Sequence, residues 1–187
     1  MADIELAIRT GGVNMIIGRM VSTLIFATLL WAGAASGVEQ GDPAPEWSAA
    51  DFSGRLVQFP DTSADKPVVV LFWATWCPYC KALMPYLERI QEDYAQAGVN
   101  VIGINTKERG RGDPGAYVES LGFPMIAIPD GDSIAEAYDV QFIPGLFVID
   151  GNGIVAYRRG WTDLPAGSTV AELWDQQVRG ALDRLLN

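Results

Sequence analysis

The most reactive side chains in this chain of 187 residues belong to Cys77 and Cys80, its only cysteines. Their spacing places the second thiol about one helical turn after the first, within reach of the same sulfur. Thiolate is the reactive form of cysteine, and a helix amino terminus stabilises that charge through unpaired N–H groups. The spacing therefore indicates thiol-disulfide exchange, in which Cys77 attacks and Cys80 resolves the mixed disulfide.

Three other interpretations of the cysteine pair remain open on the residues alone. A structural disulfide that closes so short a loop would stabilise the fold by only roughly 2 kcal/mol. A metal site would need further soft ligands, which this sequence does not offer. A pair of inert core cysteines is disfavoured because Pro78 and Tyr79, at a helix start, argue against full burial. We therefore expect a redox-active pair and no metal.

Composition excludes several other classes of protein. The absence of histidine removes Ser-His-Asp and Cys-His catalysis and His-ligated zinc or haem. The net charge is −10, from 13 basic and 23 acidic residues. No basic arm or face is evident, so we expect no electrostatic binding to nucleic acid. A hydrophobic fraction of 49% fits a globular core, and the length suits one domain plus an appendage.

An uncharged apolar run occupies residues 21–35, after Arg19 and before a stretch of small residues. A basic flank, a short apolar run and an A-x-A-like site are typical of an export signal. The run is also shorter than the roughly 20 residues that a membrane-spanning helix needs. We expect residues 1–37 to be an export signal, with an uncleaved membrane anchor or a buried helix as alternatives. Export would place residues 38–187 in the bacterial periplasm or on the outer face of the cytoplasmic membrane, where disulfides persist.

Hydrophobic patterning predicts the elements that position the cysteines. The apolar run at residues 67–74 suits a strand covered on both faces. Helical periodicity follows over residues 78–97, with Pro78 at the first helical position and Gly98 as a cap. The cysteines are thus expected between a buried strand and a helix.

The remaining pattern alternates strands and helices. Residues 106–113 read as a polar, glycine-rich loop. Parallel pairing is expected where strands and helices alternate, and a late hairpin adds antiparallel strands, so the sheet is mixed with helices on both faces. Further strands are expected in a hairpin at 47–59 and at 99–105, 125–128, 146–150 and 154–158, and further helices at 114–121, 133–138 and 170–186.

The segment FWATWCPYCK at residues 72–81, followed by Pro85, resembles the active-site segment of the thioredoxin superfamily. The lead-in GDPAP at 41–45, the hairpin around Gly54 and the export signal resemble its exported TlpA/ResA-like branch of thiol-disulfide oxidoreductases. The resemblance covers about residues 41–186. It implies an α/β thioredoxin fold, with a central mixed β-sheet flanked by helices and an N-terminal β-hairpin extension. It also implies disulfide exchange without a bound cofactor.

Members of this superfamily have a cis-proline loop that faces the two cysteines, and Ile143 and Pro144 match it here. The residue before that proline pairs its backbone with the substrate chain, so the resemblance implies that both residues bind substrate. Trp76, Pro78 and Tyr79 are assigned to the same substrate-docking surface. Core packing is the alternative for Trp76, and an ordinary trans proline is the alternative for Pro144.

The chain departs from the resemblance at three positions. Leu71 stands where classical thioredoxins have a buried Asp, and Leu83 where some ResA-like proteins have a Glu. Gly145 follows the proline, where members that mature cytochrome c often carry Pro-Glu-Thr. No side-chain carboxylate can therefore be assigned by motif as the base for Cys80, and a cytochrome-specific role is weakened.

The expected function is thiol-disulfide exchange on protein disulfides outside the cytoplasm, in the reductase direction. The expected partners are disulfide-bearing proteins and a membrane electron donor, with no nucleic acid and a membrane contact only through an uncleaved N-terminal segment. We expect a monomer. A non-catalytic peptide-binding module is one alternative. A peroxiredoxin-type antioxidant is another, disfavoured because Thr75 lies two residues before Cys77 rather than three.

Overall fold

The computed structural model describes residues 37–63 and 65–187, so nearly all of the expected export signal lies outside the described residues. Within the described part, no helix is both long and apolar enough to cross a membrane. The strands are β1 (Trp47–Ala50), β2 (Leu56–Phe59), β3 (Val68–Trp73), β4 (Asn100–Asn105), β5 (Ile126–Ile128), β6 (Gly145–Ile149) and β7 (Val155–Arg158). The helices are α2 (Pro78–Asp93), α3 (Pro114–Glu119), α4 (Asp132–Ala137) and α5 (Val170–Leu186), with short 3₁₀ turns η1 (Asp61–Ser63) and η2 (Ala95–Ala97).

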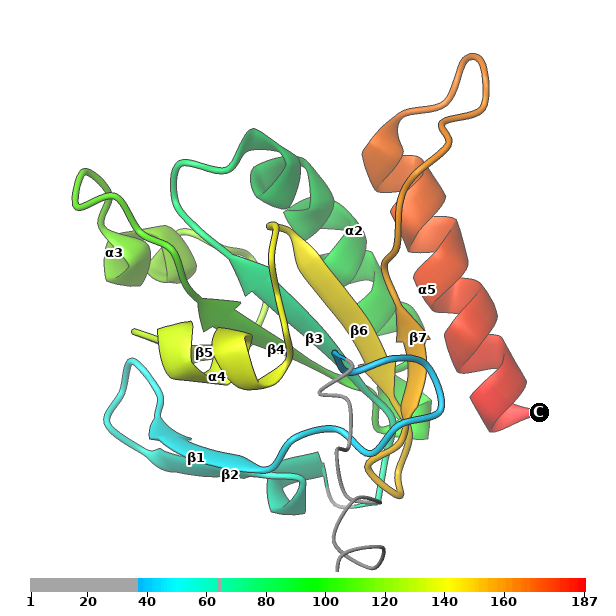
Figure 1. The fold of residues 1–187 in the computed structure, drawn as a ribbon, viewed down its shortest axis with the longest axis horizontal. Coiled ribbons are helices and arrows are strands. Elements are labelled where there is room, and N and C mark those ends of the chain that lie inside the picture. The colour runs from blue at the N-terminus through cyan, green and yellow to red at the C-terminus, as the bar shows by residue number, and fades with distance from the viewer. Residues whose placement is uncertain (1–36, 64) are drawn as a thin grey trace, which may run out of the picture. The chain divides into compact units, whose positions relative to one another are not determined.

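Strand β3 lies at the centre of a five-stranded sheet with the order β5-β4-β3-β6-β7 (Figure 1). It pairs parallel with β4 and antiparallel with β6, and every residue of β3 is buried. Strands β4 and β5 are parallel, whereas β6 and β7 are antiparallel. The predicted mixed sheet is confirmed, and β1 and β2 form the predicted hairpin as a separate two-stranded sheet.

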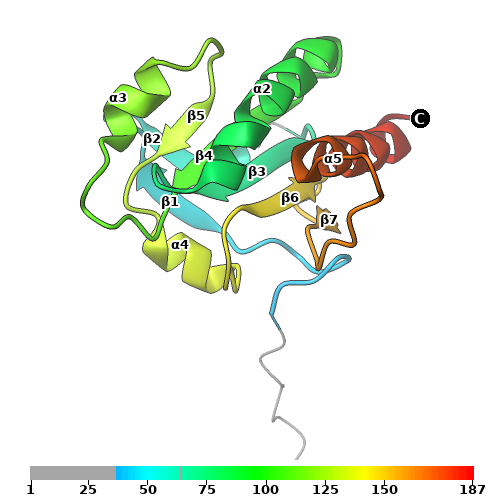
Figure 2. The ribbon, with the colours of Figure 1, turned by 90° about the horizontal axis from the view of Figure 1, so that it is seen from above.

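Alternation along β3 sends its side chains into two cores on opposite faces of the sheet. Leu71 and Trp73 join the core beneath α2 and α5. Val70 and Phe72 join the core beneath α4 and the β1–β2 hairpin. Figure 2 shows α2 and α5 on one face and α4 on the other. Helices therefore cover both faces, as the alternating pattern predicts. The carboxyl end of β3 leads directly to the start of α2.

The predicted helix over residues 78–97 is wrong in its last turn. Helix α2 ends at Asp93 because Tyr94 leaves the helical region, with φ −101° and ψ 13°. The chain then tightens into η2, and Gly98 ends that turn in the left-handed conformation with φ 76°. Gly98 thus caps the segment as predicted, but it caps a 3₁₀ turn rather than the α-helix.

Candidate active site

The two cysteines lie at the start of α2, just after the end of β3. Cys77 is the N-cap of the helix, and its Sγ accepts a hydrogen bond of 3.1 Å from the Cys80 amide. Pro78 occupies the first turn, where its missing N–H leaves no helical bond unmade. Cys77 and Cys80 form a disulfide, and their Cα atoms are 5.3 Å apart. The Cys77 sulfur therefore faces the positive end of the helix dipole, which favours the thiolate in the reduced protein.

Both cysteines are buried, contrary to the expectation from the two residues between them. Cys77 is 2% exposed and Cys80 is fully buried, whereas Pro78 and Tyr79 are exposed. The reason is helical spacing: residues three apart share a face, and this face continues through Leu83 into the core. The small exposed fraction of Cys77 makes it the more accessible of the two.

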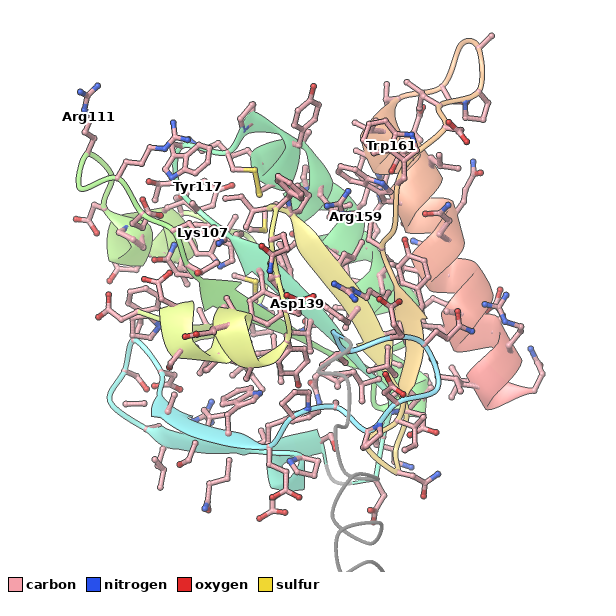
Figure 3. The ribbon with its side chains drawn as sticks, in the orientation of Figure 1. Lys107, Arg111, Tyr117, Asp139, Arg159 and Trp161 are labelled. Carbon is pink, nitrogen blue, oxygen red and sulfur yellow. A yellow bond between two sulfur atoms is a disulfide. The ribbon has the colours of Figure 1, made fainter. Side chains whose placement is uncertain are left out.

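The Ile143–Pro144 peptide is cis, as the resemblance implies. Pro144 and Tyr79 line the same groove, which has a volume of about 690 Å³. We call it the apolar groove; its other aromatic lining residues are Phe142, Phe147, Trp161 and Trp174. Phe142 is 78% exposed and Trp161 is 94% exposed. Figure 3 shows Trp161 on the segment that leads into α5. The groove thus presents aromatic surface beside the segment that links the cysteines.

Arg159 holds the cis-proline loop against the sheet. Its Nε donates a 2.6 Å hydrogen bond to the carbonyl of Pro144, and its amide donates to Leu146. Its guanidinium also lies over the ring of Trp174, 5.1 Å from the centroid. Burial lowers the pKa of Arg159, although a guanidinium remains charged throughout the physiological range. One half-buried cation therefore joins the groove's proline to its aromatic wall.

Trp76 lies on the surface at the opposite side of the cysteines, so the core-packing alternative for it is wrong. The residue is 37% exposed, and its Nε1 donates a 2.8 Å hydrogen bond to the Lys107 carbonyl. The guanidinium of Arg109 stacks over the indole, 3.6 Å from its centroid. The β4–α3 loop at residues 106–113 thus orients this tryptophan.

Glu108 fastens the same loop to the segment that carries the cysteines. Its carboxylate accepts hydrogen bonds of 2.6 Å from the Thr75 amide and 2.7 Å from the Thr75 hydroxyl. It also accepts from the Asn105 side chain at 2.8 Å. Burial alone would raise the pKa of Glu108, but the hydrogen bonds from Asn105 and Thr75 outweigh it and lower the pKa below 4.5. Gly112, in the same loop, packs so closely against Thr75 that an added Cβ atom would overlap the Thr75 side chain.

A second hollow, of about 590 Å³, opens between Trp76 and α3. We call it the basic hollow because three cations contribute to its lining. Lys81 lies 5.4 Å from the ring centroid of Tyr117, which also lines the hollow. Its principal lining residues are Lys81, Arg109, Arg111, Trp76, Asp113 and Tyr117.

The positions that depart from the resemblance are apolar and buried. Leu71 and Leu83 are fully buried in the core that includes both cysteines. Gly145 is buried at the start of β6, where an added Cβ would fall 2.8 Å from a methyl of Val140. None of these three positions offers a proton acceptor to Cys80.

Several residues beside the cysteines carry no assignment from the sequence. Residues 106–113 are expected only to form a loop, yet Glu108 and Arg109 contact the active-site segment. Phe142 and Trp161 are exposed aromatic residues. In the sequence, the one signal for a binding role is that each is a large aromatic residue outside any periodic segment. The Glu108 contact joins residues 33 positions apart, so no local pattern reveals it.

The fold and the disulfide-capped helix define the class of thioredoxin-fold thiol-disulfide oxidoreductases. A family model described as the AhpC/TSA family matches residues 40–158, and the chain belongs to that family. The chain is 30% identical over 179 residues to the thiol:disulfide interchange protein DsbE of Escherichia coli, covering 88% of this chain and 91% of the relative. It is 33% identical to the thiol-disulfide oxidoreductase ResA of Geobacillus thermodenitrificans, covering 64% and 68%.

A solved structure agrees with these relatives. A Chlorobium tepidum protein described as a DsbE-type thiol:disulfide interchange protein superposes with a TM-score of 0.64 and 26% identity. The match covers 78% of this chain and 99% of that chain. The predicted fold and the predicted family are therefore confirmed.

Proposed function

We propose that this protein reduces disulfides of other proteins outside the cytoplasm. The observation that carries the proposal is the position of Cys77 Sγ, which caps α2 and accepts the Cys80 amide hydrogen bond. In the reduced protein the same amide and the helix dipole stabilise a thiolate at this sulfur. The greater exposure of Cys77 supports its role as the attacking residue.

The reaction conserves electrons through two exchanges. The Cys77 thiolate attacks one sulfur of the substrate disulfide, a mixed disulfide forms, and the other substrate sulfur leaves as a thiolate that takes a proton. Cys80 then loses its proton and attacks Cys77, releasing the second substrate thiol. The substrate gains two electrons, and the protein is left with the Cys77–Cys80 disulfide.

Docking of the substrate is assigned to the surface on either side of the disulfide. The backbone of Ile143 pairs with the substrate chain, and Pro144 with Tyr79 offers apolar contact in the groove. Pro78 and Trp76 extend this surface across the helix start. The supporting observation is that Tyr79, Ile143 and Pro144 line one groove.

The apolar run at residues 21–35 supports a location outside the bacterial cytoplasm, in the periplasm or on the membrane's outer face. There the reductase direction requires a dithiol donor whose electrons come across the membrane. We assign that role to a membrane protein, and we assign a monomeric state to the reductase itself.

The test combines equilibrium and kinetics. Thiol trapping in glutathione buffers measures the potential of the Cys77–Cys80 pair, and we expect a value near the reducing end of the range of about −270 to −120 mV spanned by this fold. Prereduced protein should reduce insulin disulfides, Cys77→Ser should fall to the rate without protein, and Cys80→Ser should accumulate a mixed disulfide. A potential near the oxidising end would reverse the proposed direction. Insulin reduction by the unmodified protein no faster than the blank would instead indicate a non-catalytic binding module.

A further inference from the structure

Positive charge gathers beside Trp76 in an otherwise acidic protein. The chain carries a net charge of −10. Yet the basic hollow is lined by Lys81, Arg109 and Arg111 against one carboxylate, that of Asp113. All three cations are exposed. Figure 3 shows Arg111 projecting outward from the β4–α3 loop. The residue next to the attacking cysteine, Trp76, is part of the same lining.

The cations of the hollow have no ionic partner within the described chain. The ion pairs found there involve Arg55, Arg158 and Arg179. No hydrogen bond from the side chains of Arg109 or Arg111 reaches a described residue. Stacking on Trp76 occupies the face of the Arg109 guanidinium, and its N–H donors lie in the plane of the group, free of that contact.

Three carboxylates near the hollow accept hydrogen bonds from the protein's own backbone. Glu108 accepts from the Thr75 amide, and Asp113 accepts from the Ala116 amide as the N-cap of α3. Asp132 accepts from the Lys107 amide and the Thr106 hydroxyl. These contacts leave the positive charge of the hollow uncompensated by direct pairing.

Positions 83 and 145 are Leu and Gly, and both are buried, so neither brings a carboxylate near the disulfide. The arginines of the apolar groove are engaged elsewhere: Arg158 bonds the Val38 carbonyl and Arg159 the Pro144 carbonyl. Unpaired charge near the disulfide is therefore positive and lies on the Trp76 side.

We propose that the basic hollow binds carboxylates of the substrate, so that preferred substrates carry Asp or Glu beside the target disulfide. This inference rests on the proposed disulfide exchange at Cys77. An extended substrate segment joined to that sulfur leaves the apolar groove on one side and reaches the hollow on the other. Arg109 and Arg111 then offer planar forks that match carboxylate geometry. The occupant is an acidic segment of a substrate protein.

The experiment uses three peptides that share one internal disulfide and differ only in the residues beside it: Glu, Gln or Lys. The rate at which each peptide oxidises the prereduced protein is measured at about 0.01 M and about 1 M salt, because high salt screens exposed charges. We expect the Glu peptide to react about fivefold faster than the Gln peptide at low salt, from two exposed charge pairs, and the Lys peptide to be slowest. High salt should erase most of this preference.

Variants locate the preference. In R109Q/R111Q the Glu-to-Gln rate ratio should fall to about one, whereas R109K/R111K retains the charge but loses the planar forks and should keep an intermediate ratio. Arg184→Gln removes an exposed cation from the far end of α5 and should leave the ratio unchanged. A ratio that survives in R109Q/R111Q, or equal rates for the three peptides, would overturn the inference while leaving the exchange reaction in place.

Two outcomes distinguish a failure of this inference from a failure of the proposed disulfide exchange at Cys77. If the unmodified protein reacts with none of the peptides, the proposed function itself fails. Oxidised glutathione is an anionic disulfide without a protein chain, so it provides a further comparison. A rate with oxidised glutathione above that of the Glu peptide, with the same loss in R109Q/R111Q, would replace the acidic protein segment by a small anionic disulfide.

Discussion

The apolar groove and the basic hollow flank one disulfide, but their arginines do different things. In the groove, Arg158 and Arg159 donate hydrogen bonds to main-chain carbonyls and lie against aromatic rings. In the hollow, the side chains of Arg109 and Arg111 donate no hydrogen bond to a described residue, although Arg109 stacks on an indole. The groove's charges serve to build its walls and leave aromatic surface for contact, whereas the hollow presents its charge outward. Apolar contact contributes affinity, and charge contributes choice of partner and speed of association.

The two flanks also share one construction. Each places a loop beside the cysteines through a single charged side chain that bonds the main chain. Arg159 donates to the Pro144 carbonyl on one side, and Glu108 accepts from the Thr75 amide on the other. The two anchors differ in their surroundings: Arg159 also lies over the ring of Trp174, whereas Glu108 bonds polar groups. Removing each anchor therefore tests how far the flanks are equivalent.

The largest effect is expected from Arg159→Gln. This change removes a charged hydrogen bond to the Pro144 carbonyl and the contact with Trp174, so the free energy of unfolding should fall by about 2 kcal/mol. Urea unfolding measures it as a lower midpoint with an unchanged slope. Arg184→Gln, at an exposed position without an ion pair, is the matched control. Equal midpoints for Arg159→Gln and the unmodified protein would show that the cis-proline loop is held by packing alone.

A smaller effect is expected from Trp161→Ala in the apolar groove. The indole is 94% exposed, so its removal should leave stability nearly unchanged. If a protein substrate covers the indole, loss of that apolar contact should lower kcat/KM for insulin by about tenfold, equally at low and high salt. Leu164→Ala is the control, because Leu164 is exposed in the same segment but does not line the groove. Unchanged kcat/KM in Trp161→Ala would place the substrate elsewhere.

The sequence predicts the parts of the site that depend on local patterns and misses those that depend on contacts between distant residues. The buried run of β3 and the periodicity of α2 are local patterns, so the junction that holds Cys77 and Cys80 is predictable. Ile143 and Pro144 are recognisable only through the family resemblance. The anchors are not local: Arg159 reaches a carbonyl 15 positions away and Glu108 an amide 33 positions away. The prediction that the cysteines are not fully buried is wrong, because exposed neighbours at a helix start say little about the opposite face.

The smallest effect is expected from Glu108→Gln, and its signature is a dependence on pH. The amide side chain keeps the shape but loses the charge that strengthens the bonds from Thr75, so the free energy of unfolding should fall by about 1 kcal/mol at pH 7. The pKa of Glu108 is lowered in the folded protein, so its contribution is fully present above the ordinary value of 4.5. As the pH falls through the lower folded-state pKa, the carboxylate is protonated and that contribution is lost. The stabilities of the two proteins should therefore converge in acid.

Urea unfolding of both proteins across this pH range measures the convergence. Glu119→Gln, an exposed change at the end of α3, is the control and should track the unmodified protein throughout. A constant difference between Glu108→Gln and the unmodified protein down to low pH would mean that side-chain shape, rather than charge, secures the loop. In that case the hollow would keep its cations in place without Glu108 being ionised, and the contrast between the two flanks would rest on the aromatic contact of Arg159. Convergence would instead show that the carboxylate itself holds the loop carrying Arg109 against the segment that leads to Cys77.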